Sequence, residues 1–362
     1  MFNYKKLELA RKRRSLTKKV LAEKLNLSIQ TLSEWENGKT EPKTENLAEL
    51  SKILKFPIDF FCDNREVKDL VKEKVSFRAL TKMKASDREL ALSCGSLAIF
   101  FDSWLTDKFN LPKPNIPNFE GYSPEEAAAE TKKYWNVSEE YIDNTVYLLE
   151  KNGIRVYSLC ESKKDFDAFS TWINNTPYVF LNTTKSSERS RFDAMHELGH
   201  LVLHRNKKLQ DKKIEEEANQ FASCILMPKE SVNNYDIDLN IGFLIQLKQI
   251  WKVSLKALVY RLYKLDLITE WYYRLLMVDI NKRGYNIQEP ASVERETSVV
   301  LNKIFDILKA DNITIYDIAN ELKLPVQELN SMIFNMFDIF KTIDGLGIES
   351  PNTVSKPNLR II

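Results

Sequence analysis

Apolar residues recur at helical spacing along most of the chain, beginning with three short blocks near its start. These blocks predict helices over residues 18–25, 28–35 and 45–54. Thr17 and Ser28 precede the first two helices as capping side chains. The inner face of the first helix is expected to carry Val20, Leu21 and Leu25. Short helices joined by tight turns predict a small helical domain at this end.

Further along, short apolar runs precede two longer helices. Strands are predicted over residues 154–159, 166–172 and 178–181. Helices follow over residues 187–204 and 214–227, and the last part of the chain predicts helices over 270–283, 293–308, 315–322 and 326–336. Many helices beside a few strands predict a mainly α chain with a small β-sheet, an α+β fold.

Proline clusters and changes in pattern divide the chain into four parts. Pro112, Pro114 and Pro117 interrupt the chain, and a capping box from Ser123 to Glu126 opens the next helix. The predicted parts are a small helical domain at 1–62, a helical connector at 63–118, an α+β domain at 119–267 and a helical region at 268–362.

Composition indicates an ordinary globular protein, with 43% hydrophobic and 29% charged residues. No apolar run approaches the length of a membrane span, and the start of the chain lacks the apolar core of a secretion signal. The four cysteines are far apart, which favours buried thiols in a reducing compartment over disulfides. We therefore expect a cytoplasmic protein without a membrane partner.

Positive charge is concentrated at the start of the chain. The net charge of the whole chain is +2, but residues 1–24 hold 9 Lys and Arg against 2 Asp and Glu. A basic first helix beside short helices with a tight turn describes a helix-turn-helix, whose partner is double-stranded DNA. The alternatives are a solvated basic face and a protein-binding module of the same fold.

Several stretches resemble the Xre family of phage-type repressors over roughly residues 5–62. The matching residues are Leu16-Thr17, Leu21 to Leu25, Ser28 to Lys39, and Pro42. The resemblance implies five helices, with the third entering the major groove of a DNA operator, usually as a homodimer. Base-facing residues would be Ser28, Gln30, Thr31 and Ser33, and phosphate contacts would be Arg13, Lys18, Lys19 and Lys39.

The three histidines of the chain all lie within nine positions, at 196, 200 and 204. His196, Glu197 and His200 form an H-E-x-x-H sequence on a predicted helix. Imidazoles four residues apart point the same way and can reach one metal ion. Glu197 lies where it can take the proton of a metal-activated water. The pattern predicts the catalytic helix of a zincin-like zinc peptidase.

A catalytic zinc ion needs a third protein ligand. His204 is a poor candidate, because eight residues of helix carry it about 12 Å along the axis from His196. A better source is the acidic start of the helix over 214–227. Helical angles place Glu216 opposite the inward stripe, but they leave Glu215 and Glu217 as equal candidates.

A second resemblance favours one of the two glutamates. Arg189 to Phe192, Ala194 to His200, and Glu215 to Pro228 are similar to the ImmA/IrrE family of metallopeptidases, over about residues 145–265. In that family the glutamate four residues before the asparagine completes the zinc site, which implies Glu215 here. Related systems act on a repressor that bears an Xre domain, so the expected protein substrate is such a repressor.

The sequence supports three functional hypotheses. The first is a DNA-binding transcriptional regulator with a zinc endopeptidase that cleaves itself or a partner repressor. The second is a non-enzymatic transcription factor whose zincin-like domain senses a ligand or a metal. The third is a peptidase that docks on protein substrates through its first domain. Residues 315–329 superficially suggest a second helix-turn-helix, but their expected exposed residues Asp317, Glu321 and Glu328 favour packing or dimerisation over DNA binding.

Overall fold

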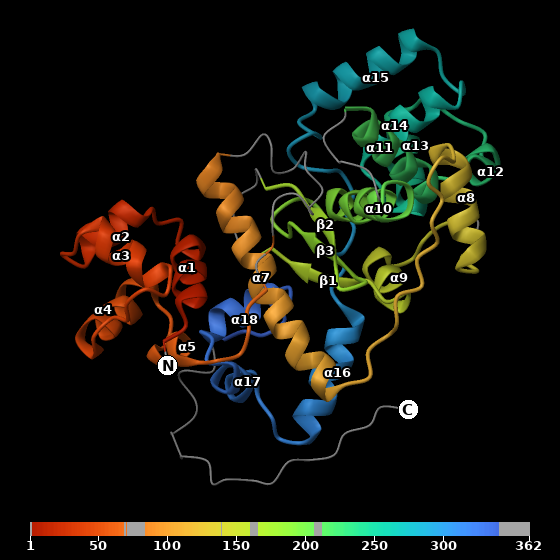
Figure 1. The fold of residues 1–362 in the computed structure, drawn as a ribbon. Coiled ribbons are helices and arrows are strands. Elements are labelled where there is room, and N and C mark those ends of the chain that lie inside the picture. The colour runs from red at the N-terminus through yellow and green to blue at the C-terminus, as the bar shows by residue number, and fades with distance from the viewer. Residues whose placement is uncertain are drawn as a thin grey trace.

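The computed structural model describes residues 2–68, 70, 84–138, 140–159, 166–205 and 212–339 (Figure 1). Part of the predicted connector, Cys160 and the last residues from 340 onward lie outside this range. The chain is mainly helical with one small sheet, as the apolar pattern predicted. The first half of its elements are α1 (Tyr4–Arg13), α2 (Lys18–Lys24), α3 (Ile29–Glu36), α4 (Thr44–Leu54), α5 (Ile58–Cys62), α7 (Ala85–Lys108), α8 (Pro124–Tyr134), α9 (Thr145–Lys151), β1 (Arg155–Ser158), β2 (Phe169–Ile173) and β3 (Thr176–Leu181).

The remaining elements are helices. They are α10 (Ser187–Leu203), α11 (Lys212–Leu226), α12 (Lys229–Asn233), α13 (Ile241–Trp251), α14 (Leu255–Lys264), α15 (Glu270–Lys282), α16 (Val299–Ala310), α17 (Ile315–Leu322) and α18 (Val326–Met332). None of the helices in the described ranges combines the length and apolarity needed to cross a bilayer. Cys94 and Cys224 are buried thiols as expected, whereas Cys62 is exposed because it ends α5 at the surface.

The sheet has three strands in the order β1, β3, β2. Strand β3 pairs parallel with β1 and antiparallel with β2. A two-residue turn joins β2 to β3, and both of its residues, Asn174 and Asn175, have positive φ. Turns of this kind match the twist of the flanking strands. The three strands lie close to the predicted positions.

The two faces of the sheet pack against two different hydrophobic cores. Tyr157 and Phe180 point toward α7 and belong to the core that also contains α1 to α5 and α16 to α18. Their neighbours Val156 and Val179 point the other way, into the core built on α8 to α15. Because successive strand residues face opposite sides, a single short sheet serves both cores. In Figure 1 the sheet lies between α7 and α10.

The first five helices, α1 to α5, pack together and share a hydrophobic core with α7 and α16 to α18. Thr17 and Ser28 cap α2 and α3 by accepting hydrogen bonds from Val20 and Thr31 backbone amides. Leu21 is fully buried, but Val20 is exposed, so the prediction that Val20 faces inward was wrong. Val20 lies about 100° around the helix from Leu21, beyond the edge of the buried face.

Several basic side chains at the start of the chain are buried and form ion pairs with carboxylates of the same protein. Lys6 is buried and pairs with Asp63, and Arg11 pairs with buried Glu36 at 2.5 Å. Arg13 is buried against Glu328 of α18, so the prediction that Arg13 contacts phosphate was wrong. The expectation that Glu328 is exposed was wrong for the same reason. These pairs join α1 to the rest of the molecule and leave fewer cations for DNA.

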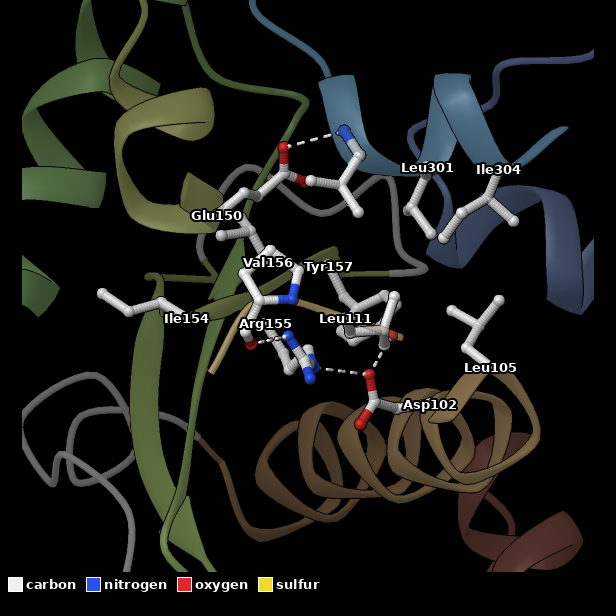
Figure 2. Close-up of a pocket in the computed structure, with 12 residues that line it drawn as sticks. Asp102, Leu105, Leu111, Glu150, Ile154, Arg155, Val156, Tyr157, Leu301 and Ile304 are labelled. Carbon is white, nitrogen blue, oxygen red and sulfur yellow. Dashed lines mark hydrogen bonds and ion pairs between the residues drawn. The ribbon is translucent and has the colours of Figure 1, made fainter. Parts of the chain in front are cut away.

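Helix α7 is buried along most of its length and lies between the first domain and the sheet. Its Asp102 is buried and accepts hydrogen bonds from the hydroxyls of Tyr157 and Tyr178. Arg155 of β1 reaches the same carboxylate, with its Nε 3.2 Å from Oδ1 (Figure 2). Burial raises the pKa of Asp102, although Arg155 and the two tyrosines oppose the effect. This polar cluster holds α7 to the sheet.

A small pocket beside this cluster lies between α7, β1, α9 and α16 (Figure 2). On its far side, Glu150 of α9 accepts a hydrogen bond from the Ser298 hydroxyl and from the first amides of α16, Val299 and Val300. The helix predicted over 293–308 therefore begins later, at Val299, because Ser298 and Glu150 together satisfy its free amides. Burial raises the pKa of Glu150 to about 7, against the opposing effect of these hydrogen bonds.

Glu150 is expected to make stability depend on pH. Its pKa is about 7 in the folded chain and 4.5 in its ordinary state, so the folded chain holds the proton more tightly. The contribution of Glu150 to the unfolding free energy is therefore fully present below its unfolded pKa and is lost as pH rises through about 7. The loss amounts to roughly 3 kcal/mol. Between about pH 5 and pH 8, the unfolding free energy of Glu150→Gln should therefore fall less than that of the wild type.

Denaturant unfolding at several pH values measures this difference. Glu230→Gln, on the exposed surface of α12, is the matched control and should keep the wild-type pH dependence. If Glu150→Gln and the wild type show the same pH dependence, the assigned role of Glu150 is wrong.

Candidate metal centre and DNA-facing helix

Helix α10 carries the H-E-x-x-H residues on one continuous helix, which begins with Ser186 as its capping side chain. Helix α11 packs closely against it at Gly199. A Cβ atom on Gly199 would lie 3.3 Å from the Ala218 Cα and 3.1 Å from the Phe221 ring, tighter than ordinary contact. The missing side chain therefore lets the two helix backbones approach, and this approach brings the acidic start of α11 to the histidines.

Three side chains converge at this helix contact. The Nε2 atoms of His196 and His200 are 3.1 Å apart. Glu215 of α11 reaches both rings, with carboxylate oxygens 3.4 Å from His196 Nε2 and 3.5 Å from His200 Nε2. One ligand atom from each residue lies within 4.8 Å of the others, which is a separation that a single metal ion can bridge.

Within this group, His196 and Glu215 shift each other's pKa values. Burial alone would raise the pKa of Glu215, but hydrogen bonds and charge from His196 and His200 outweigh burial and lower it. Burial alone would lower the pKa of His196, yet Glu215 and the neighbouring charges of Glu197 and Asp193 raise it. The carboxylate is thus held in its ionised form, as a metal ligand must be.

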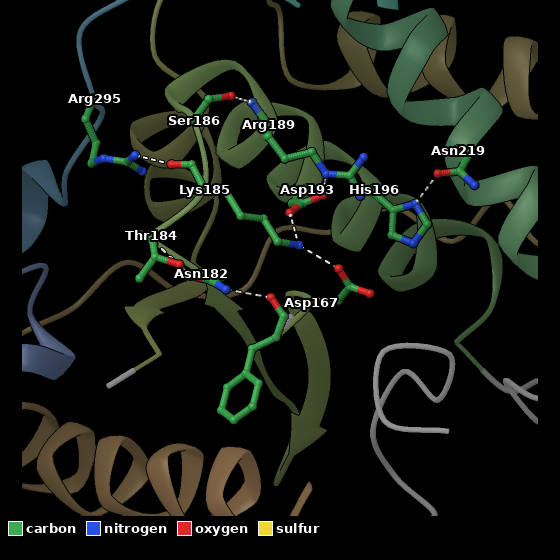
Figure 3. Close-up of polar contacts among 11 residues, drawn as sticks. Asp167, Asn182, Thr184, Lys185, Ser186, Arg189, Asp193, His196, Asn219 and Arg295 are labelled. Carbon is green, nitrogen blue, oxygen red and sulfur yellow. Dashed lines mark hydrogen bonds and ion pairs between the residues drawn. The ribbon is translucent and has the colours of Figure 1, made fainter. Parts of the chain in front are cut away.

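Each histidine has a second partner at its other ring nitrogen. Nδ1 of His196 is 3.0 Å from the Asn219 side-chain oxygen (Figure 3). Nδ1 of His200 is 3.2 Å from Nδ1 of His204, and Nε2 of His204 is 2.9 Å from a carboxylate oxygen of Glu217. These contacts leave both Nε2 atoms directed at Glu215.

The contact between His200 and His204 determines which ring nitrogen of each histidine carries a proton. If Nε2 of His200 offers its lone pair to a metal, Nδ1 carries the proton and donates it toward His204. His204 must then accept at Nδ1 and donate from Nε2 to Glu217. A carboxylate behind a ligating histidine holds the ring and raises its basicity. His204 therefore lies beside the centre as a supporting residue, in agreement with the helical distance that made it a poor ligand.

The three successive glutamates of α11 have three different surroundings. Glu215 is buried beside the two histidines, and Glu217 supports His204. Glu216 is exposed, and its carboxylate lies 3.4 Å from the ammonium group of Lys212 on the same helix. The helical angles left Glu215 and Glu217 equal, and the geometry groups Glu215 with the rings. Glu197 is buried on α10 next to His196.

A polar network borders the centre on the side of His196 (Figure 3). Asp193, one turn before His196, pairs with Arg189 at 2.8 Å and with Lys185 at 3.3 Å. Lys185 also reaches Asp167 at 2.5 Å. Neither this network nor the contact of Asn219 with His196 was predicted from the sequence. The spacing of Asn219, four residues after Glu215 on the same helix face, was the one available signal.

The predicted DNA-facing residues lie on and around α3. Ser28, Gln30, Lys19 and Lys39 are exposed, and Thr31 and Ser33 are partly exposed. Lys18 is half-buried and lies 3.2 Å from Glu36, so part of its charge is already paired. The Gln30 amide donates to Glu34 at 3.1 Å, and the Ser28 oxygen caps α3. Lys19 lies 4.0 Å from Glu23 on the same helix, so Lys39 is the cation of the predicted set without an ion pair among the described residues.

Two protein-family models match parts of the chain. Residues 7–61 match the helix-turn-helix model, and residues 149–263 match the model of the IrrE N-terminal-like domain, a peptidase family. The chain joins an Xre-like helix-turn-helix domain to an IrrE-like peptidase domain. The predicted fusion is thus confirmed, and the IrrE-like match includes all three residues of the histidine–glutamate group. No curated protein matches the chain as a relative.

Exchange of each α11 glutamate for glutamine should affect metal binding differently. In the IrrE-like domain, Glu215→Gln removes the charged donor and should abolish tight binding of one Zn²⁺ per chain. Glu217→Gln weakens the support of His204 and should reduce affinity about 10- to 100-fold. Glu216→Gln is the exposed control and should bind as the wild type does.

Competition of each variant with a chromogenic chelator measures these affinities. Equal affinities for the wild type and Glu215→Gln would exclude Glu215 from the metal site. A loss in Glu216→Gln as large as that in Glu217→Gln would show that the effect is not specific to the contact with His204.

Proposed function

We propose that the protein is a DNA-binding transcriptional regulator whose IrrE-like domain is a zinc-dependent endopeptidase. The convergence of His196, His200 and Glu215 in one buried group, with Glu197 beside it, carries this proposal. A structural metal site has no need of the carboxylate at Glu197, whereas peptide hydrolysis needs a base there.

The donor set fits zinc. Two imidazole nitrogens and one carboxylate oxygen form a three-ligand set with a free fourth position, as catalytic zinc sites have. A Zn²⁺ ion bound there would supply the Lewis acidity that activates water for attack on a peptide carbonyl. Asn219 and His204 contact the Nδ1 atoms of His196 and His200, so both Nε2 atoms face Glu215, where the ion would bind.

Glu197 carries out the proton transfers of the proposed reaction. Glu197 accepts the proton from the attacking water and passes it to the amine that leaves the cleaved bond. His196 is the most accessible of the three donors, because its side chain is 15% exposed against 2% for His200 and 7% for Glu215. A substrate peptide is therefore expected to approach from the side of His196, along the Asp193 network.

The proposed substrate is a repressor-type protein, either a second regulator or the chain itself. The join of a helix-turn-helix domain to an IrrE-like domain in one chain supports this choice, because it brings a peptidase to operator DNA. An operator as partner also implies that the protein works in the cytoplasm. In the alternative function, the same buried group is a metal or ligand sensor without catalysis.

Glu197→Gln separates the peptidase from the sensor. The substitution should leave zinc affinity near that of the wild type, because Glu197 lies outside the donor group, and should lower the rate of repressor cleavage by at least about 100-fold. The measurement incubates the zinc-loaded protein with Xre-type repressors of the same genome and follows cleavage by mass spectrometry. Unchanged regulation of the target promoter by Glu197→Gln in cells would support the sensor.

Two substitutions near α3 test the operator contact. Gln30→Ala should cost about 1–3 kcal/mol on a duplex selected from a random pool, because it removes a bidentate base contact. Lys39→Ala should weaken binding to all duplexes alike and reduce the slope of log affinity against log salt by about 1. The control is Lys52→Ala, at an exposed lysine of α4 that pairs with Glu49.

Affinity across a salt series distinguishes the outcomes. Absence of duplex binding by the wild type at low salt would overturn the operator model and favour a protein-docking module. Equal slopes for Lys39→Ala and the wild type would remove Lys39 from the phosphate contacts.

A further inference from the structure

Helix α15 has apolar residues on two opposite faces. One face contains the buried residues Leu276 and Ile280 and packs against α14, where the Tyr273 ring stacks on Tyr263 with centroids 4.7 Å apart. The opposite face carries Trp271, Leu275 and Val278 at i, i+4 and i+7. A helix with one buried face is expected to carry polar residues on the other.

This outer stripe is unusually open to solvent. Trp271 is 66% exposed, Leu275 49% and Val278 51%. No residue in the part of the chain that the structure describes covers it, and α15 lies at the outer edge of the molecule, well away from α1 to α5 (Figure 1). Contiguous apolar surface of this kind usually marks a place of protein association.

We propose that the stripe, Trp271, Leu275 and Val278, binds the same stripe of a second copy of this chain, with the two α15 helices antiparallel. A two-fold axis between Leu276 and Met277 would then set Leu275 of one copy against Val278 of the other. The same register sets Trp271 against Lys282, a pairing of an indole face with an ammonium group that is favourable.

The charges of α15 favour this orientation. Glu270 begins the helix, and Lys282 and Arg283 lie at its end. An antiparallel pair opposes the two helix dipoles and brings Lys282 of one copy to the start of the other helix, whereas a parallel pair sets Lys282 against Lys282. Along the flanks, Arg274 is paired with Glu270 and Arg283 with Asp279, so neither side of the stripe presents unbalanced charge.

The size of the stripe sets the expected strength. One tryptophan and two aliphatic side chains on each copy bury less than the roughly 1,600 Å² of a standard stable interface. The dimer should therefore be weak and should form in the micromolar range. Because α15 lies away from α3, each copy keeps its helix-turn-helix domain free for DNA.

Two single variants and their mixture test the register. In Leu275→Lys, the two new lysines would lie near each other across the two-fold axis, and in Val278→Glu the two new glutamates would do so. Each variant alone should raise the dimer dissociation constant at least about tenfold. Mixed together, they should form a heterodimer, because the introduced lysine of one copy meets the introduced glutamate of the other.

Sedimentation equilibrium of the full chain measures all three samples. Ile58→Glu, at a comparably exposed apolar position on α5, is the control and should dimerise as the wild type does. A wild type that stays monomeric throughout the micromolar range would overturn the proposal. A dimer that Leu275→Lys and Val278→Glu leave intact, or whose mixture gains no association, would place the interface elsewhere.

Discussion

The close contact of α10 with α11 is the constraint on which the candidate centre depends. Neither helix alone holds a complete donor set, because α10 supplies two imidazoles and α11 supplies the carboxylate. Gly199 allows the contact, since any side chain there would meet the Ala218 backbone and the Phe221 ring. The hydrophobic stripe of α11 provides the packing energy, and the acidic first turn gains its position from that packing. The packing of one helix pair thus determines where the three candidate metal ligands lie.

The helix pair α10 and α11 packs in one of two hydrophobic cores that lie on opposite faces of the sheet. The sheet gives its aliphatic face to the core that contains α10 and α11, and its aromatic face to the core that contains α7 and the first domain. The buried ion pair between Arg13 of α1 and Glu328 of α18 then ties the helix-turn-helix domain into that second core. Helix α3 and the candidate metal ligands therefore belong to neighbouring cores that share one sheet.

The sequence predicted the elements well where the signal is local. Caps at Thr17 and Ser28, the strands and the two helices of the centre all follow from neighbouring residues. Helical angles did not separate Glu215 from Glu217. The family resemblance implied Glu215, and the packing of α11 on α10 brings Glu215 to His196 and His200. Arg13 and Glu328 were both assigned to the surface. Their contact joins residues more than 300 positions apart, and no local pattern records such a pair.

The outer stripe of α15 is a second feature that the local sequence pattern did not predict. Periodicity predicted the helix, but it could not tell which of the two apolar faces the chain itself would bury. The basic residues of the first domain are also less available than the sequence suggested. Several of them neutralise buried carboxylates, so only part of the positive charge remains for a nucleic acid.

X-ray absorption of the zinc-loaded full chain tests the central claim most directly, because it reports the atoms around the metal. The account predicts a shell of nitrogen and oxygen at about 2.0–2.2 Å, with the outer-shell signal of two imidazoles and no sulfur. A shell with three imidazoles, or with sulfur, would contradict the assignment of His196, His200 and Glu215.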